Sequence, residues 1–550
     1  MNIKEKHQIS IDIIYSGSRK ETVNVAESIT RVKIQPMQGE NLVQASVNIP
    51  MVDITTRWIP SLKPGLARNI PWTETMPFGV QMNFPVYALL NAAGRVRFAL
   101  ESTNLIDDGE FHFAINQEKC TCELTLTTTL RPETVPFQII FDQRDATINE
   151  TLEAWRNELA LPNFKYNEKA YAPVFCTWYA VHGAVDQAFV ERSCPLAKEL
   201  GFGTLIVDDG WCYDEYKRVS PVTISDWYES IGDWNVSTKK FPDFKNHVKR
   251  IQALGMNYML WVAPHLIGRK SAICKTIKDE TSDDYVEGYY KLDVNKADAT
   301  PIVRKLRALA RDNMLDGLKI DFLDIMPPNV QVPNAARTCD FIAALTDALK
   351  DDNPNVLIEF RQSYATPAML KYGTQFRAGD APFDWRLNFG RLAEIRLNIG
   401  SLAPVHADPA YWAPGETPEN IARHLMAMLV GVPMLSMDLE RLTPLEKRLI
   451  RHYVGFYNSH RELINHGKWN ILYNQTEIAA AVAKNAHEKL VIICDAHVLK
   501  DAVGKIDSDT WVMNLSCSDI PASGATQCFN AQGFNSPDGT IPIGGSGRIY

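Results

Sequence analysis

Eight short apolar runs alternate with helical patterns in the middle of the chain, and this alternation limits the fold more than any other feature. Each run ends in a polar or charged residue and is followed by a loop. The runs are residues 173–178, 204–208, 257–262, 317–321, 356–361, 375–379, 401–406 and 434–438. Eight strands separated by helices within about 300 residues predict a (β/α)8 TIM barrel. An open doubly wound sheet is the alternative, but the glycine fingerprint that binds phosphate in such sheets does not follow the first run.

The two ends of the chain have a different pattern. Up to about residue 148, apolar residues recur at strand-like intervals, and residues 120–130 alternate almost perfectly, which predicts an N-terminal β-sandwich. From residue 472 onward, short strands at 477–482, 490–494 and 510–514 predict a small antiparallel β domain. Because 550 residues exceed one compact core, we expect three domains, at 1–162, 163–470 and 471–550.

Composition and charge exclude several classes of protein. A net charge of -8 without a basic run gives no reason to expect a nucleic-acid partner. No stretch supplies the ~20 consecutive apolar residues of a membrane helix. Residues 1–17 lack the apolar stretch of a secretion signal. The 10 scattered cysteines are typical of reduced thiols, so we expect a cytoplasmic protein, and a homo-oligomer stays open.

Side chains at the carboxyl ends of barrel strands converge on one pocket, so the ends of the runs supply the candidates for chemistry. Carboxylates and aromatic residues dominate there. The candidates include Trp178, Asp208, Asp209, Trp211, His265, Lys319, Asp321, Glu359, Arg361, Asp380, Asp384, His406 and Asp408. Such a group of carboxylates either binds a divalent metal or divides acid and nucleophile roles on a glycosidic bond.

The metal hypothesis is the weaker of the two. Only His265 and His406 lie near strand ends, and neither has a second histidine at helical ligand spacing. A metal-dependent sugar isomerase or lyase would use Asp208, Asp209, Asp321 and His265 as ligands.

The glycosidic hypothesis needs one carboxylate to attack and one carboxyl group to donate a proton. Asp321 and Asp380 follow the fourth and sixth runs, so they can face each other across the mouth of the barrel. A single Asp after a strand is otherwise an ordinary helix cap.

Six segments, in this order along the chain, carry a family resemblance. They are 205–211 (Leu-Ile-Val-Asp-Asp-Gly-Trp), 232–235 (Gly-Asp-Trp-Asn), 240–244 (Lys-Phe-Pro-Asp-Phe), 254–264 (Leu-Gly-Met-Asn-Tyr-Met-Leu-Trp-Val-Ala-Pro), 316–321 (Asp-Gly-Leu-Lys-Ile-Asp) and 377–384 (Arg-Ala-Gly-Asp-Ala-Pro-Phe-Asp). Together they resemble the α-galactosidases of glycoside hydrolase family 36 and their clan. The resemblance covers about residues 172–469, and the β-rich ends agree with that family's flanking domains.

The resemblance implies a role for each matching residue. Asp321 is expected to be the nucleophile and Asp380 the general acid/base. Asp208 and Asp209 are expected to bind sugar hydroxyls, which both can reach only if the chain turns at Gly210. The other expected substrate-binding residues are Trp178, Trp211, Trp234, Trp261, His265, Arg269, Lys319, Arg361 and Asp384. For the tryptophans, core packing remains the alternative.

Charge at the strand ends should separate the two catalytic carboxyl groups. Lys319 lies two residues before Asp321 on one strand, so both side chains point to the same face, and the positive charge should keep Asp321 ionised. Low solvent exposure near Asp380 should raise the pKa of that residue relative to Asp321.

The chain departs from the family pattern at three places. After the fifth run the family usually has a cysteine- and glycine-rich segment that ends in arginine, whereas residues 358–364 are Ile-Glu-Phe-Arg-Gln-Ser-Tyr. His265 stands where a glutamate usually follows the proline, and Phe322 and Leu323 replace a polar pair after the nucleophile. The first departure affects the contacts that the family makes there to position 2 of the sugar.

The resemblance implies a retaining exo-α-glycosidase, most of all an α-galactosidase, that acts on an oligosaccharide or glycoside without a cofactor. The departures leave open a hydrolase or transglycosylase for a galactose relative, such as an α-N-acetylgalactosaminide or a β-L-arabinopyranoside. A carbohydrate-binding protein without turnover is a further alternative.

Overall fold

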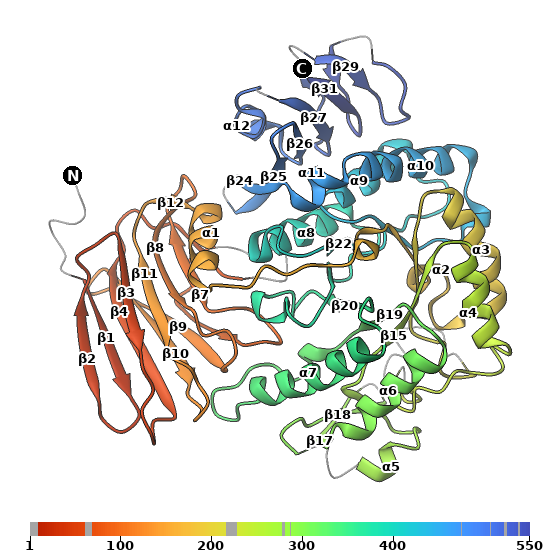
Figure 1. Ribbon diagram of the computed structural model, residues 1–550. Coiled ribbons are helices and arrows are strands. Elements are labelled where there is room, and N and C mark those ends of the chain that lie inside the picture. The colour runs from red at the N-terminus through yellow and green to blue at the C-terminus, as the bar shows by residue number, and fades with distance from the viewer. Residues whose placement is uncertain are drawn as a thin grey trace.

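The computed structural model describes residues 9–60, 69–215, 228–277, 281–286, 288–296, 298–474, 476–506, 508–521, 525–536 and 539–549. A barrel lies between an N-terminal and a C-terminal β-rich part (Figure 1). This arrangement confirms the predicted fold class.

The N-terminal part is a sandwich of two sheets. The first sheet has the order β2 (Lys20–Asn24), β1 (Ser10–Tyr15), β4 (Leu42–Pro50), β10 (Thr121–Thr129), β9 (Gly109–Asn116) and β6 (Thr73–Phe78). The second has the order β3 (Ile29–Ile34), β11 (Phe137–Asp142), β8 (Arg95–Ser102), β7 (Val86–Leu90) and β5 (Thr56–Trp58), and β12 (Ala146–Thr147) pairs with β8. Apolar residues at every second position face inward from both sheets, which explains the alternation seen in the sequence.

Strand β7 of the second sheet is buried on both faces. On β7, Tyr87 and Leu89 face the core of the sandwich, whereas Val86 and Ala88 join the core that continues into the barrel. Helix α1 (Ile148–Glu158) also joins that core through Trp155, whose indole nitrogen donates to the Ser102 carbonyl oxygen at 2.9 Å. One continuous core therefore crosses the proposed domain boundaries. We propose that the chain is still divided into three domains, after residues 162 and 470.

All eight predicted runs form parallel strands, most of them shorter than predicted. They are β13 (Val174–Cys176), β14 (Thr204–Val207), β15 (Asn257–Val262), β19 (Gly317–Ile320), β20 (Leu357–Arg361), β21 (Gln375–Arg377), β22 (Val405–His406) and β23 (Met434–Leu435). Their order is β22-β21-β20-β19-β15-β14-β13-β23. Parallel bridges from His406 to Val432 and from Ala410 to Leu435 join the two ends of this sheet, which closes the barrel and excludes the open doubly wound alternative.

Helices cover the outside of the barrel (Figure 1). The longer ones are α3 (Gln187–Glu199), α4 (Phe244–Ala253), α6 (Thr300–Asp312), α7 (Ala335–Asp352), α8 (Trp385–Ile399), α9 (Pro418–Ala427) and α10 (Pro444–Ser459), and the shorter ones are α2 (Trp178–Val181), α5 (Cys274–Ile277) and α11 (Arg461–His466). Helix α12 (Leu499–Val503) instead lies in the C-terminal β-rich part (Figure 1). The starts of the helices are set locally. Helix α10, for example, has Pro444 in its first turn and a capping box in which Thr443 and Glu446 bond each other's backbone N–H groups.

A small sheet after β15 was not predicted from the sequence. It contains β16 (Leu266–Gly268), β18 (Tyr289–Leu292) and β17 (Thr281–Val286), which are antiparallel. Its strands are too short for a clear alternation pattern, so their pairing depends on the tertiary contacts of this loop region.

The C-terminal part is a sheet with the order β24 (Lys468–Asn474), β25 (Glu477–Lys484), β26 (Glu488–Ile493), β27 (Asp509–Asn514), β31 (Ser546–Ile549) and β29 (Ala525–Phe529). A pair of short strands, β28 (Ile520–Pro521) and β30 (Thr540–Ile541), lies beside it. The neighbours are antiparallel as predicted, except that β26 and β27 are parallel and are connected through α12. Among the described helices, none combines the length and the apolar character that crossing a bilayer would need.

Candidate active site

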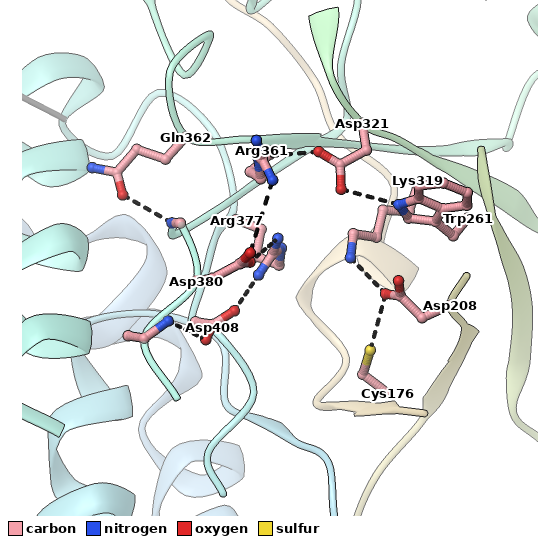
Figure 2. Close-up of polar contacts among 12 residues, drawn as sticks. Cys176, Asp208, Trp261, Lys319, Asp321, Arg361, Gln362, Arg377, Asp380 and Asp408 are labelled. Carbon is pink, nitrogen blue, oxygen red and sulfur yellow. Dashed lines mark hydrogen bonds and ion pairs between the residues drawn. The ribbon is translucent and has the colours of Figure 1, made fainter. Parts of the chain in front are cut away.

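Charged side chains from the carboxyl ends of five barrel strands meet at the mouth of the barrel. Asp208 follows β14, Lys319 lies in β19, Asp321 follows β19, Arg361 ends β20, and Asp380 follows β21. Asp408, which follows β22, lies beside them (Figure 2). Parallel strands in a barrel bring residues that are distant in sequence to one face, so the predicted convergence is observed.

Asp321 is buried and held by three donors. The Trp261 indole nitrogen donates to Oδ2 at 3.0 Å, the Phe322 backbone N–H donates to Oδ1 at 2.9 Å, and Arg361 Nε lies 3.1 Å from Oδ1 (Figure 2). Burial raises the pKa of Asp321, but the charges of Arg361 and Lys319 outweigh it, so the pKa lies below its ordinary value. The carboxylate is therefore ionised and oriented, as attack on a carbon centre requires.

Arg361 connects the two carboxylates that the sequence predicts to be catalytic. Its guanidinium lies 3.1 Å from Asp321 and 3.9 Å from Asp380, and it also lies 3.9 Å from Asp324. The side chain is 18% exposed. Asp321 and Asp380 thus face one guanidinium across the mouth, which agrees with the expectation that they face each other.

Asp380 is held by a second arginine. Arg377 Nη2 donates to Asp380 Oδ1 at 3.0 Å, and Arg377 Nη1 donates to Asp408 (Figure 2). Asp408 is fully buried and also accepts from the Ala381 backbone N–H at 2.7 Å. This chain of contacts fixes where the Asp380 carboxylate points.

The electrostatics of Asp380 differ from the prediction. Its side chain is 49% exposed. Partial desolvation raises the pKa of Asp380, but the charges of Arg377 and Arg361 lower it much more, so the pKa lies well below its ordinary value. The prediction that low exposure raises the pKa of Asp380 above that of Asp321 is therefore wrong, because it did not include the charges of the two arginines.

Lys319 is buried and paired with Asp208. Its Nζ donates to Asp208 Oδ2 at 2.6 Å, and the Cys176 thiol lies 3.3 Å from the same oxygen (Figure 2). Burial and Arg377 lower the pKa of Lys319, but the carboxylates of Asp208 and Asp321 outweigh them and keep the amine charged. The predicted effect of Lys319 on the ionisation of Asp321 is confirmed.

Asp209 is a buried carboxyl group whose two oxygens have no hydrogen-bond partner among the described residues. Burial and the neighbouring Asp208 raise the pKa of Asp209 to about 7. A buried carboxyl group without hydrogen-bond partners lowers the stability of the fold. A ligand hydroxyl that donates to Asp209 would supply the missing hydrogen bond and so favour binding.

The backbone turns at Gly210 as the sequence predicts. Its φ is +115°, and a Cβ at this position would overlap backbone atoms of Gly183 and lie 2.8 Å from that carbonyl oxygen. Lys240 fixes the turn, because its Nζ donates to the carbonyl oxygens of Gly210 and Gly183 at 2.6 and 2.7 Å.

We expect Gly210→Ala to lower the free energy of unfolding by about 3 kcal/mol, the sum of left-handed strain and a backbone clash. The matched control is Gly415→Ala, because Gly415 has a φ of +83° and nothing within 4 Å of a built Cβ. It should lose only about 1 kcal/mol. Scanning calorimetry at one scan rate would compare the two, and equal decreases in Tm would show that the contact with Gly183 has no cost.

The tryptophans pack mainly on one another. Trp211 and Trp234 are almost fully buried, with ring centroids 6.3 Å apart, and Trp211 donates to the Trp261 carbonyl oxygen at 2.8 Å. Trp261 binds Asp321 directly. Trp178 is partly exposed and packs 4.6 Å from His182. Core packing, the alternative that the sequence left open, therefore describes Trp211 and Trp234 in the ligand-free protein.

Three other predicted substrate-binding residues have structural contacts of their own. His265 is buried, packs with its ring centroid 5.0 Å from that of Phe341 on α7, and has a pKa lowered to about 4 by burial. Arg269 pairs with Glu229 at 2.6 Å. Asp384 accepts from the Leu387 backbone N–H at 2.9 Å and so caps α8.

Two of the residues proposed as metal ligands have other partners in the structure. Asp208 is bonded to the Lys319 ammonium, and His265 faces Phe341. Within the described ranges, no three His, Cys, Asp or Glu side chains come together as metal ligands.

Sequence reasoning assigned no role to Arg377, Asp408 or Cys176. A signal for Arg377 was present, since it is a charged residue within a short apolar strand, which is the argument that identified Lys319. Asp408 was noted only as a carboxylate at a strand end, and Cys176 gives no signal in the sequence.

Known proteins are similar to this chain over the region that contains the candidate active site. The Melibiase family matches residues 145–467. "Alpha-galactosidase 1" of Pediococcus pentosaceus is 25% identical over 343 residues, which cover 57% of this chain and 44% of that protein. "Alpha-galactosidase AgaA" of Geobacillus stearothermophilus is 23% identical, over 59% of this chain and 46% of that protein. The chain thus spans less than half the length of these curated relatives.

The solved structures that are similar show the same fold. A variant of the glycoside hydrolase family 36 α-galactosidase AgaA, in complex with 1-deoxygalactonojirimycin, superposes with a TM-score of 0.65 at 16% identity, over 86% of this chain and 71% of that one. AgaB from Geobacillus stearothermophilus has a TM-score of 0.64 at 18% identity, over 87% of this chain and 71% of that one. Because the family match covers more than half of the 550 residues, this chain belongs to the Melibiase family.

Proposed function

We propose that this protein is a retaining exo-α-glycosidase, most of all an α-galactosidase that hydrolyses terminal α-galactosides. The observation that carries the proposal is the pair of carboxylates Asp321 and Asp380, which face one guanidinium at the mouth of the barrel. Membership of the Melibiase family supports the same reaction class.

In the first step, Asp321 Oδ attacks the anomeric carbon while Asp380 gives a proton to the leaving oxygen, so the C–O bond breaks and a glycosyl ester forms. In the second step, Asp380 takes a proton from water, the water oxygen attacks the anomeric carbon, and Asp321 leaves as a carboxylate. Two inversions keep the α configuration. The carboxyl groups of retaining enzymes lie ~5 to 5.5 Å apart, and we expect this spacing in the sugar complex.

Asp380 must carry a proton in the first step, so its low pKa has to rise when the substrate binds. Arg377 and Arg361 hold Asp380 ionised in the ligand-free protein, which suits the base of the second step. A sugar between Asp321 and Asp380 displaces the Arg361 guanidinium and excludes water, and both changes raise the pKa of Asp380 so that it can carry the proton.

In this proposal, carboxylates at the end of β14 bind the hydroxyl groups of the sugar. Asp209 has two free oxygens among the described contacts, and Asp208 is held by Lys319, so both can accept from hydroxyls of one sugar. A substrate epimer that lacks the matching hydroxyl leaves a buried carboxyl unpaired, which disfavours binding by ~1 to 3 kcal/mol.

Relatives support an α-galactoside as substrate. The structures of AgaA variants include complexes with raffinose and with stachyose. A galactose relative is the second candidate. Arg361 ends β20, where the family usually has its contacts to position 2, and its guanidinium reaches Asp321 and Asp380. A different group at that position of the sugar would fit this change.

A screen of nitrophenyl glycosides tests the proposal. The panel contains the α-galactoside, the α-N-acetylgalactosaminide, the β-L-arabinopyranoside and, as the epimer control, the α-glucoside. Hydrolysis of the α-galactoside with release of α-galactose supports the proposal, and the first-formed anomer is read by NMR. Absence of turnover on all four, with sugar still bound, favours the binding-protein alternative.

We expect Arg361→Met to move both limbs of the pH profile of kcat/KM to higher pH. The two limbs of kcat/KM report the ionisation of Asp321 and Asp380 in the free protein, where Asp321 must be ionised and Asp380 must be protonated for the first step. Arg361 lowers the pKa of both groups, so its removal raises both pKa values. The control is Arg337→Met, an arginine on α7 with a side chain 67% exposed. Unmoved limbs in the Arg361 variant would contradict the electrostatic role.

A further inference from the structure

An exposed phenylalanine stands close to Asp380 in a backbone conformation that costs energy. Phe383 has a φ of +60° and is 56% exposed. A bulky side chain rarely adopts this left-handed conformation, and such strain persists where the surrounding structure enforces it, often at functional sites. An exposed aromatic ring also gains little from burial, so packing alone does not explain the position.

Two tyrosines support the Phe383 ring from neighbouring loops. The Phe383 and Tyr411 ring centroids are 4.7 Å apart, and Tyr411 stacks on Tyr179 with centroids 5.9 Å apart. Tyr179 follows β13, Phe383 follows β21 and Tyr411 follows β22. Since segments that follow barrel strands lie at the mouth, the three rings form an aromatic cluster at the edge of the candidate active site, in which the Phe383 ring is tilted by 55° from the ring of Tyr411.

The aromatic cluster is joined to the acid/base candidate. The Tyr179 hydroxyl donates to Asp408 Oδ2 at 2.9 Å, and Arg377 bonds both Asp408 and Asp380. Phe383 is three residues from Asp380, and a turn in which the Asp384 N–H donates to the Ala381 carbonyl oxygen at 3.2 Å folds the segment between them. The half-exposed Asp380 carboxylate and the exposed face of Phe383 therefore belong to one rigid corner of the mouth.

The proposed function decides which part of a substrate reaches this corner. The general acid donates to the oxygen of the leaving group, so the leaving group lies on the side of Asp380, whereas the cleaved sugar lies on Asp321, Lys319 and Asp208. Aromatic faces bind rings that have apolar faces, and pyranose rings have such faces through their C–H groups.

We propose that Phe383, supported by Tyr411, is a platform on which the leaving-group sugar ring stacks, so that the preferred substrates are oligosaccharides whose second residue is a pyranose. The proposal rests on the proposed function and extends it from the terminal sugar to the leaving group. Phe383 contacts the leaving group only and takes no part in the bond-breaking step.

The test compares Phe383→Ala with the wild type on two substrates. One is a disaccharide of galactose α-linked to glucose, and the other is α-galactosyl fluoride, whose leaving group has no ring. We expect kcat/KM to fall about fivefold to tenfold on the disaccharide and to stay within about twofold on the fluoride, since stacking of one ring accounts for an effect of this size. Phe383→Tyr keeps a ring and should restore the wild-type ratio of the two kcat/KM values.

The control is Phe534→Ala, because Phe534 is a phenylalanine of similar exposure, 54%, in the C-terminal β-rich part, where it packs against Arg448. It should change neither value. An equal loss on both substrates, or no loss on the disaccharide, overturns the platform.

A binding measurement separates the platform from the proposed function. Calorimetry on Asp321→Asn, with and without Phe383→Ala, gives the Kd of the disaccharide without turnover. We expect the Kd to rise about fivefold when the ring is removed. An unchanged Kd refutes the platform, whereas absent hydrolysis of both substrates by the wild type refutes the proposed function and leaves the Kd comparison to decide the platform.

Discussion

Replacing Asp321 by alanine should lower kcat by about 10⁴-fold or more, because no neighbouring group can replace a carboxylate nucleophile. Lys319 and Arg361 are cations, and the Trp261 indole is a donor, so the side chains whose charge or hydrogen bond stabilises the Asp321 carboxylate cannot attack an anomeric carbon. Added azide should restore part of the activity by entering the space that the carboxylate leaves. The product should then be β-galactosyl azide, since a single attack inverts the configuration. Turnover and the anomeric NMR signal of the product measure both effects.

The matched control is Asp324→Asn. Asp324 lies three residues further along, and its carboxylate lies 3.9 Å from Nη2 of Arg361, whereas Asp380 lies 3.9 Å from Nη1. It should keep activity within about tenfold of the wild type. Near-normal turnover by Asp321→Ala without azide would remove Asp321 from the role of nucleophile.

Asp380→Ala should show a loss that depends on the leaving group. On a disaccharide, whose leaving oxygen needs a proton, kcat/KM should fall by about 10²- to 10⁴-fold. On α-galactosyl fluoride the loss should be within about tenfold, because fluoride departs without a full proton transfer. Azide should now give α-galactosyl azide, because it replaces water in the second of two inversions. The opposite azide anomers from the two variants would establish the retaining mechanism.

The matched control is Asp438→Ala. Asp438 follows β23 and accepts from the Glu440 backbone N–H, so it is a strand-end aspartate with a capping role. Its loss should be equal on both substrates and small. If Asp380→Ala behaved in the same way, Asp380 would be a structural cap too, and the acid would have to be sought elsewhere, with Asp209 as the first candidate because its pKa is about 7.

The two carboxyl groups also respond differently to their surroundings. Asp321 is buried and bonded to Trp261, Phe322 and Arg361, so its ionised form is fixed in position. Asp380 is half-exposed and bonded through Arg377 to Asp408, so solvent and ligand can change its charge. In the proposed mechanism, this difference in exposure lets one group keep its charge while the other exchanges a proton.

The sequence by itself determined the barrel and the positions of Asp208, Lys319, Asp321, Arg361 and Asp380 at its mouth. The reason is local. An apolar run that ends in a charged residue and is followed by a helical pattern fixes a strand and its carboxyl end, and parallel strands in a barrel place those ends together. Gly210 was predictable in the same way, because two adjacent carboxylates can reach one ligand only through a turn.

Only the tertiary structure decided how these charges pair. The guanidinium of Arg361 lies between two catalytic candidates, and Arg377 bonds Asp380 and Asp408. These contacts join residues from four strands, β19 to β22. Such contacts depend on distances of 3 to 4 Å between side chains that are far apart in sequence, and no local pattern encodes them. A pKa follows from these distances and from burial, which is why the sequence predicted the ionised state of Asp321 correctly from its neighbour Lys319 but predicted Asp380 in the wrong direction.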